Sequence, residues 1–120
     1  MNMRMGQLAE ERAALWLARQ GYEIVVRNWR VKYGEIDIVA VHEGVLVFAE
    51  VKYREREGFG RPEEYVTTTK RRRLFRAVGE YLTQHPFTGP MRFEVLAMTG
   101  DGRICLLQDY GFDLEGVLGV

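Results

Sequence analysis

Residues Gly34–Lys52 read GEIDIVAVHEGVLVFAEVK, and this stretch decides the fold. Its apolar residues alternate as in two β-strands, at about Glu35–Val41 and Val45–Tyr53, and the Glu43-Gly44 pair between them is typical of a tight turn. We therefore expect a β-hairpin that buries one face. Charged residues interrupt the apolar pattern of this hairpin at four positions: Glu35, Asp37, Glu50 and Lys52.

A two-residue turn at Glu43-Gly44 places Asp37 opposite Glu50 and Glu35 opposite Lys52, with opposed Cβ atoms ~4.5–5.5 Å apart. Two facing carboxylates repel each other unless a proton or a cation lies between them. Oxygen ligands suit a hard divalent ion, so the pattern favours a site for Mg²⁺ or Mn²⁺ with the lysine beside it. The alternative is a set of ordinary cross-strand ion pairs on a solvated face.

The first helix carries another acidic candidate. Residues 6–20 have helical periodicity and end before Gly21, a common C-terminal cap. On this helix Glu10 points the same way as Leu17, whereas Glu11 lies nearer the flank. A core-facing glutamate is costly without a partner, so we expect Glu10 to complete the acidic cluster. The alternative is that Glu10 only complements the helix dipole.

The middle of the chain is basic. Between Lys52 and Arg76 there are nine Lys or Arg residues and four Asp or Glu residues, although the formal net charge of the whole chain is zero. Such a segment is typical of contact with an anionic partner, nucleic acid foremost, while a solvated helix face is the alternative. The basic residues that we expect to contact nucleic acid are Arg54, Arg56, Lys70, Arg72, Arg73 and Arg76.

The remaining pattern completes the expected order of elements. A strand is expected at Tyr22–Arg27, followed by a polar connection at Asn28–Gly34. A loop at Glu55–Glu64 precedes a second helix, which starts at Thr67–Thr69, runs to about Gln84 and turns Lys70 inward. Strands at Met91–Met98 and Ile104–Leu107 follow. The order α-β-β-β-α-β-β predicts an α/β fold with a mixed sheet flanked by helices.

Composition limits the class of protein. The 120 residues are 47% hydrophobic and 28% charged, which is typical of a globular chain, and we expect residues 1–120 to form one domain. No apolar run approaches the ~20 residues of a membrane span, and no signal-peptide pattern is present. The single cysteine, Cys105, excludes an internal disulfide and agrees with a reducing cytoplasm. We therefore expect a cytoplasmic protein without a membrane partner.

The chain resembles the YraN-like family of small bacterial proteins. The resemblance rests on these segments: GQLAEERAALWLARQGYEIVVRNWR, GEIDIVA, FAEVKYR, VTTTKRRRL and RFEVLAM. That family is placed in the restriction-endonuclease-like superfamily and is similar to archaeal Holliday-junction resolvases. The resemblance implies a restriction-endonuclease-like mixed sheet and a metal-dependent endonuclease that hydrolyses phosphodiester bonds in nucleic acid, DNA foremost and branched DNA among the substrates. It also implies a homodimer, by analogy with the resolvases.

The resemblance assigns roles to particular residues. Asp37, Glu50, the carbonyl of Val51 and Glu10 are implied ligands of Mg²⁺ or Mn²⁺, and Lys52 is the implied catalytic lysine. Glu35 and Lys70 occupy two further motif positions, which we group with the residues that face nucleic acid.

Two other functions stay open at this point. One is a non-catalytic nucleic-acid-binding module of the same fold, and the other is an adaptor whose basic helix binds a protein.

Overall fold

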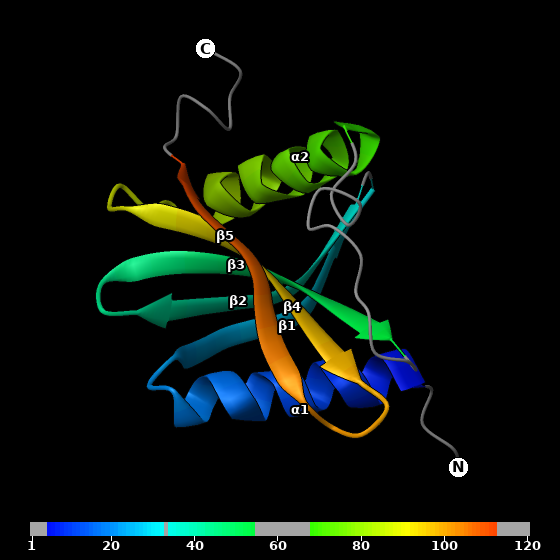
Figure 1. The fold of residues 1–120 in the computed structure, drawn as a ribbon. Helices are drawn as coiled ribbons and strands as arrows, with labels where there is room; N and C mark the ends of the chain where they lie inside the picture. The colour runs from blue at the N-terminus through cyan, green and yellow to red at the C-terminus, as the bar shows by residue number, and fades with distance from the viewer. Residues whose placement is uncertain (1–4, 33, 55–67, 113–120) are drawn as a thin grey trace.

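The structure is a computed structural model that describes residues 5–32, 34–54 and 68–112, with side chains for residues 7–32, 34–53 and 72–106. The described chain forms a five-stranded mixed sheet with a helix on each face (Figure 1). The predicted α/β class and the predicted order of elements are confirmed. In chain order the elements are α1 (Met5–Arg19), β1 (Glu23–Val31), β2 (Gly34–His42), β3 (Val45–Arg54), α2 (Thr68–Gln84), β4 (Met91–Thr99) and β5 (Ile104–Phe112).

The strands lie in the sheet in their sequence order, β1 to β5. Neighbouring strands are antiparallel except β3 and β4, which are parallel and are connected through α2. The β2–β3 turn is the predicted two-residue turn at Glu43 and Gly44. Both residues have positive φ, 50° and 80°, as a turn that matches the right-handed twist of a hairpin requires.

Two apolar cores lie on opposite faces of the sheet. The face under α1 is packed by small and branched residues, which include Ala13, Leu17, Ile38, Ala49 and Leu96. The face under α2 is larger and more aromatic, with Phe48, Val78, Tyr81 and Phe93 at its centre. Because the sheet is covered on both sides, a charged group on its central strands is shielded from water. Within the described chain, neither helix has both the length and the apolar character needed to cross a membrane.

The first strand is longer than predicted. Asn28–Gly34 was expected to be a polar connection, but β1 continues through Asn28 to Val31 and pairs with β2 down to Gly34. The strand persists because Trp29 and Val31 pack against the α2-side core. Asn28 adopts φ 53°, and the register shifts between Ile24 and Val26, so this edge strand is irregular. The prediction was wrong because an edge strand tolerates polar residues that a central strand does not.

The last strand is also longer than the predicted Ile104–Leu107. It extends to Phe112, which pairs with Met91 at the start of β4. The full length of β4 therefore serves as a template for β5.

Candidate metal centre

The predicted hairpin register holds for part of β2 and β3. The ladder runs from His42–Val45 to Ile38–Ala49, as the two-residue turn requires, and ends there. Beyond that point β2 stays paired with β1, while β3 stays paired with β4. Figure 1 shows the two pairs of strands diverging, with β1 and β2 directed toward the start of α2. We call this opening in the sheet the fork.

The predicted pairs Asp37–Glu50 and Glu35–Lys52 are not part of the ladder. Like charges in directly opposed positions destabilise a sheet, which favours separation of the strands at Asp37 and Glu50. Glu35 instead lies opposite Arg30 of β1, and Arg30 Nε is 3.5 Å from its Oε2. The fork therefore replaces the predicted facing pair with an opening lined by carboxylates.

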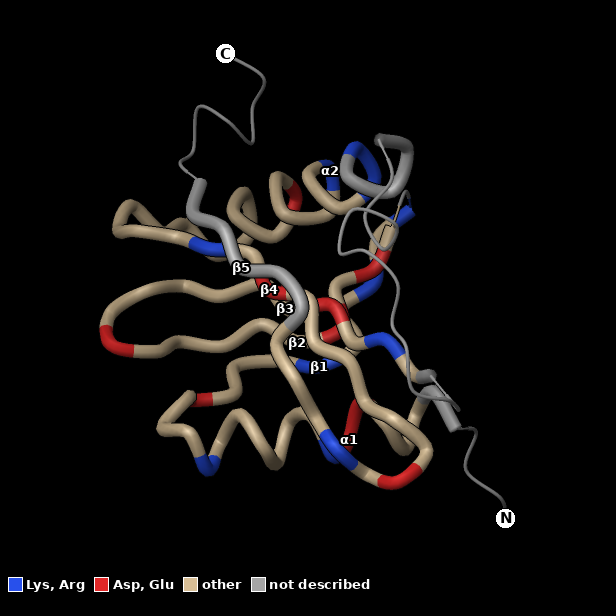
Figure 2. The backbone as a smooth tube through the Cα atoms, in the orientation of Figure 1, with Lys and Arg blue, Asp and Glu red and all other residues tan. Residues whose placement is uncertain are grey.

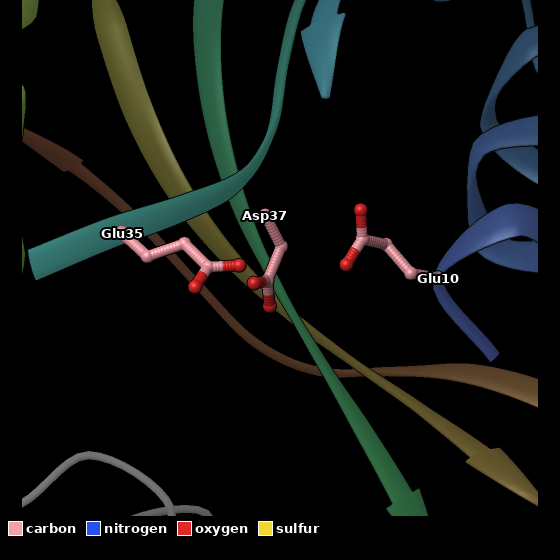
Figure 3. A group of neighbouring side chains, drawn as sticks. All are labelled: Glu10, Glu35 and Asp37. Atoms are coloured by element: carbon pink, nitrogen blue, oxygen red, sulfur yellow. The ribbon is translucent and has the colours of Figure 1, made fainter. Parts of the chain in front are cut away.

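Three carboxylates meet at the fork: Glu10 of α1 and Glu35 and Asp37 of β2. Each offers one oxygen, and these oxygens all lie within 4.8 Å of one another. Figure 3 shows the three side chains pointing toward a common centre. We call them the carboxylate triad. The grouping differs from the prediction, since Glu35 was expected to face nucleic acid and Glu50 was expected to be a ligand.

The predicted orientation of the first helix is confirmed by Glu10. This residue is buried at 7% exposure, whereas Glu11 is partly exposed. The Oε1 atom of Glu10 is buried without a hydrogen-bond partner, and Arg27 Nε, at 3.9 Å, is too distant to donate one. Burial raises the pKa of Glu10, and the charge of Arg27 partly opposes this. A buried acceptor left unsatisfied costs about 1–3 kcal/mol, so this atom lacks a partner that the fold does not supply.

Asp37 is the most perturbed acid of the triad. Its Oδ2 accepts a hydrogen bond of 2.8 Å from the backbone N–H of Val51. Burial raises the pKa of Asp37 to about 7, and the charges of Glu10, Glu50 and Glu35 add to this rise, while the hydrogen bond from Val51 lowers it. Without a cation, therefore, this carboxyl is about half protonated near neutral pH.

The same hydrogen bond locates the carbonyl that was predicted as a ligand. In a β-strand the N–H and the C=O of one residue point to the same edge. Because the N–H of Val51 reaches Asp37 on β2, its C=O also faces the fork. This carbonyl adds a neutral oxygen to the acidic oxygens of the triad.

Glu50 and Lys52 form an ion pair at the fork. Lys52 Nζ lies 3.1 Å from Glu50 Oε1, and both side chains are largely buried. Burial raises the pKa of Glu50, whereas the charge of Lys52 and its hydrogen bond lower it. The pair brings the predicted catalytic lysine close to the acidic site, and it places Glu50 outside the triad.

A pocket of about 290 Å³ opens at the fork. It is lined by Gly34, Glu35 and Asp37 of β2, Ala49 and Glu50 of β3, and Arg73 and Leu74 of α2. We call it the fork pocket. Arg72, Arg73 and Arg76 are all exposed, as predicted, and of the three only Arg73 lines the pocket. Figure 2 shows basic positions on the first turns of α2 and acidic positions on the strands at the fork.

Some predicted contacts lie outside the described part of the structure. Arg56 and the loop at Glu55–Glu64 belong to residues 55–67, which are not described, and the side chains of Arg54 and Lys70 are not described either.

Sequence reasoning missed the contribution of β1 to the site. Arg27 and Arg30 were assigned to the end of a strand and to a connection, yet they approach Glu10 and Glu35. A signal was available, because both arginines and Trp29 follow a β-strand pattern of period two. It was overridden by the polar character of Asn28.

A second polar group lies away from the fork, around the fully buried Glu94. Arg92 Nε and the Tyr22 hydroxyl each donate to Glu94 Oε1 at 2.7 Å. An Arg92 Nη2 atom lies 3.0 Å from His42 Nδ1, and the ring of His42 stacks on Tyr22. These mutual contacts explain how a glutamate is accommodated in a central strand, and they give this group a structural role.

Comparison with known proteins places the chain in a family. Residues 9–98 match the family described as "Uncharacterised protein family UPF0102". A UPF0102 protein of Cytophaga hutchinsonii is 38% identical over 100 residues, which cover 83% of this chain and 88% of that protein. One from Shewanella amazonensis is 42% identical over 99 residues, covering 82% and 92%. One from Cupriavidus necator is 46% identical over 111 residues, covering 92% and 83%. The chain therefore belongs to the UPF0102 family, the YraN-like family that its sequence resembles.

Proposed function

We propose that this protein is a metal-dependent nuclease that binds Mg²⁺ or Mn²⁺ at the fork and hydrolyses phosphodiester bonds in nucleic acid, with DNA as the first candidate. The observation that carries the proposal is the carboxylate triad, in which three acidic side chains from two elements converge at the edge of the apolar core. Such convergence is unfavourable without a cation, and the raised pKa of Asp37 expresses that cost.

The donor atoms at the fork suit a hard divalent cation. Glu10, Glu35 and Asp37 supply anionic oxygens, and the carbonyl of Val51 faces the same opening. The Glu10 Oε1 atom, which lacks a hydrogen-bond partner, would acquire one in the cation. Oxygen donors of this kind favour Mg²⁺ or Mn²⁺ over softer metals. Glu50 lines the same pocket and would hold Lys52 in place or contribute a further oxygen.

The residues of the fork have separate roles in the proposed reaction. When bound, a cation of this kind polarises a phosphate oxygen and makes a water molecule more acidic. Lys52 is fixed by Glu50 at 3.1 Å, so its ammonium group provides a positioned positive charge. A charge fixed before the reaction stabilises negative charge that develops on the phosphate. The hydrogen bond from Val51 holds Asp37 in its orientation.

The exposed arginines of α2 supply a surface for the phosphate backbone. Arg72, Arg73 and Arg76 lie on the outer side of the helix whose inner side packs on the core through Leu74 and Ala77. A local group of arginines attracts phosphates even on a chain with zero net charge, and the affinity should fall steeply with salt.

A cleavage panel tests the proposal. Linear duplex, single-stranded, flapped and four-way DNA, with matched RNA strands, are incubated with the purified protein in Mg²⁺, in Mn²⁺ and in chelator. We expect cleavage of at least one substrate that depends on metal, is lost in Lys52→Ala and is retained in Glu11→Gln, a neighbouring acid outside the site. Salt-sensitive binding without any cleavage would support the non-catalytic module instead. Absence of binding at low salt would support the adaptor.

A further inference from the structure

Arg73 differs from the neighbouring arginines in its position. Arg72, Arg73 and Arg76 are all exposed, but only Arg73 lines the fork pocket together with Glu35, Asp37 and Glu50. Its backbone is also closely packed, since a Cβ atom added to Gly34 would lie 2.9 Å from the carbonyl oxygen of Arg73. The first turns of α2 are therefore seated directly on β2, and Arg73 is held at the mouth of the pocket.

The pairing of charges around the fork sets Arg73 apart as well. Arg27 is closest to Glu10, Arg30 to Glu35, and Lys52 to Glu50. No acidic side chain in the described ranges forms an ion pair with Arg73, although two carboxylates of the triad line the same pocket. The guanidinium is therefore available to a ligand that enters the pocket.

The pocket thus presents carboxylates from the strands and a guanidinium from the helix. A cation alone would satisfy the carboxylates and be repelled by Arg73, and an anion alone would meet the opposite problem. A metal cation together with a phosphate satisfies both sides, because guanidinium groups bind phosphate oxygens through paired N–H donors.

We propose that Arg73 contacts the same phosphate that the carboxylate triad acts on through its cation. Arg72 and Arg76 contact phosphates further along the strand. The inference rests on the proposed function and assigns the substrate-binding role of one residue within that site. It predicts that loss of Arg73 impairs the reaction step, whereas loss of Arg72 impairs affinity.

Three variants and two binding measurements separate these roles. The variants are Arg73→Ala, Arg73→Lys and Arg19→Ala, the last being a control that removes an exposed arginine at the end of α1. Calorimetry first measures Mn²⁺ affinity without nucleic acid, and all three variants should bind Mn²⁺ within about threefold of wild type. A second titration adds inorganic phosphate to the Mn²⁺-saturated proteins. Arg73→Ala should lose at least about 10-fold in phosphate affinity, Arg73→Lys should lose less, and Arg19→Ala should be unchanged.

Cleavage kinetics give an independent measurement on the best DNA substrate. Arg73→Ala should lower kcat about 100-fold, the effect typical of removing one donor that stabilises developing charge. Arg72→Ala should chiefly raise KM. Equal losses of kcat in these two variants would overturn the inference, as would equal phosphate affinity of Arg73→Ala and Arg19→Ala, or no phosphate binding by wild type. If wild type cleaves no substrate, the nuclease proposal fails, while the phosphate titration still decides the role of Arg73.

Discussion

The Asp37 carboxyl shows how a single residue reports on its site. Its pKa is raised from 3.8 to about 7, mainly by burial and further by neighbouring carboxylates. The folded state therefore binds this proton more strongly than the unfolded state does. By linkage, the stability that this group contributes is fully present below pH 3.8 and is lost as the pH rises through about 7. Glu10 and Glu50, whose pKa values are also raised, act in the same direction.

Replacing Asp37 with Asn should stabilise the metal-free protein at pH 8. The amide oxygen can still accept the hydrogen bond from Val51, but the buried charge is gone. We expect a gain of about 1–3 kcal/mol, since each unit of pKa shift corresponds to about 1.4 kcal/mol. Chemical denaturation in chelator at pH 8 and at pH 4.5 measures the gain, which should shrink at the lower pH. A variant less stable than wild type at pH 8 would show that Asp37 is an ordinary structural residue.

Glu10 and Glu11 provide a matched pair for testing the triad. Both are glutamates of α1, but Glu10 lies in the triad and Glu11 is partly exposed. Glu10→Gln should weaken Mn²⁺ binding about 10-fold or more, because affinity for hard cations depends on the number of charged ligands. Glu11→Gln should have little effect. Calorimetric titration of the two variants makes the comparison, and equal losses would exclude a ligand role specific to Glu10.

At the scale of elements, the sequence predicted what depends on local pattern. Alternation in Gly34–Lys52 and the Glu43-Gly44 turn gave the hairpin and five correct pairs. Helical periodicity gave the burial of Glu10. The fork could not be predicted this way, because it arises where β2 follows β1 and β3 follows β4, which is a competition between partners rather than a property of one strand. The membership of Glu35 in the triad follows from the fork, so the prediction missed it.

The contact between α2 and β2 can be tested at Gly34. An added Cβ would lie 2.9 Å from the backbone oxygen of Arg73, closer than atoms tolerate, so α2 must shift. We expect Gly34→Ala to destabilise the protein by about 1–3 kcal/mol, the usual cost of overpacking, and to weaken phosphate binding in the fork pocket. Denaturation and the phosphate titration measure the two effects.

Gly44→Ala is the control for that experiment. Gly44 has φ 80° and no atom within 4 Å of an added Cβ, so alanine there introduces backbone strain without a collision. It should reduce stability by about 1 kcal/mol and leave phosphate binding unchanged. If both variants reduced phosphate affinity equally, the effect of Gly34→Ala would reflect general destabilisation rather than displacement of α2.

At the scale of the whole molecule, the fork joins parts that otherwise pack separately. The α1-side and α2-side cores lie on opposite faces of the sheet and account for most of the buried apolar residues. The triad draws one ligand from α1 and two from β2, and the pocket wall comes from α2. A cation bound there would therefore connect α1 to the sheet beneath α2. The fold itself does not depend on this connection, because neither core includes the triad.

Divalent metal should consequently stabilise a protein that is already folded, by mass action on the native state. At a free concentration 100 times the dissociation constant, the gain is about 2.7 kcal/mol, or roughly 10 °C in Tm for a chain of this size. Because the cation competes with the proton on Asp37, whose pKa is about 7, the gain should be larger at pH 8 than at pH 5.5. Thermal melts in chelator and in excess Mn²⁺ at both pH values measure it for wild type, Asp37→Asn and Glu11→Gln. Wild type and Glu11→Gln should gain alike and Asp37→Asn far less, because it has lost a charged ligand. A gain of equal size in all three proteins, or one that does not change with pH, would place metal binding somewhere other than the fork.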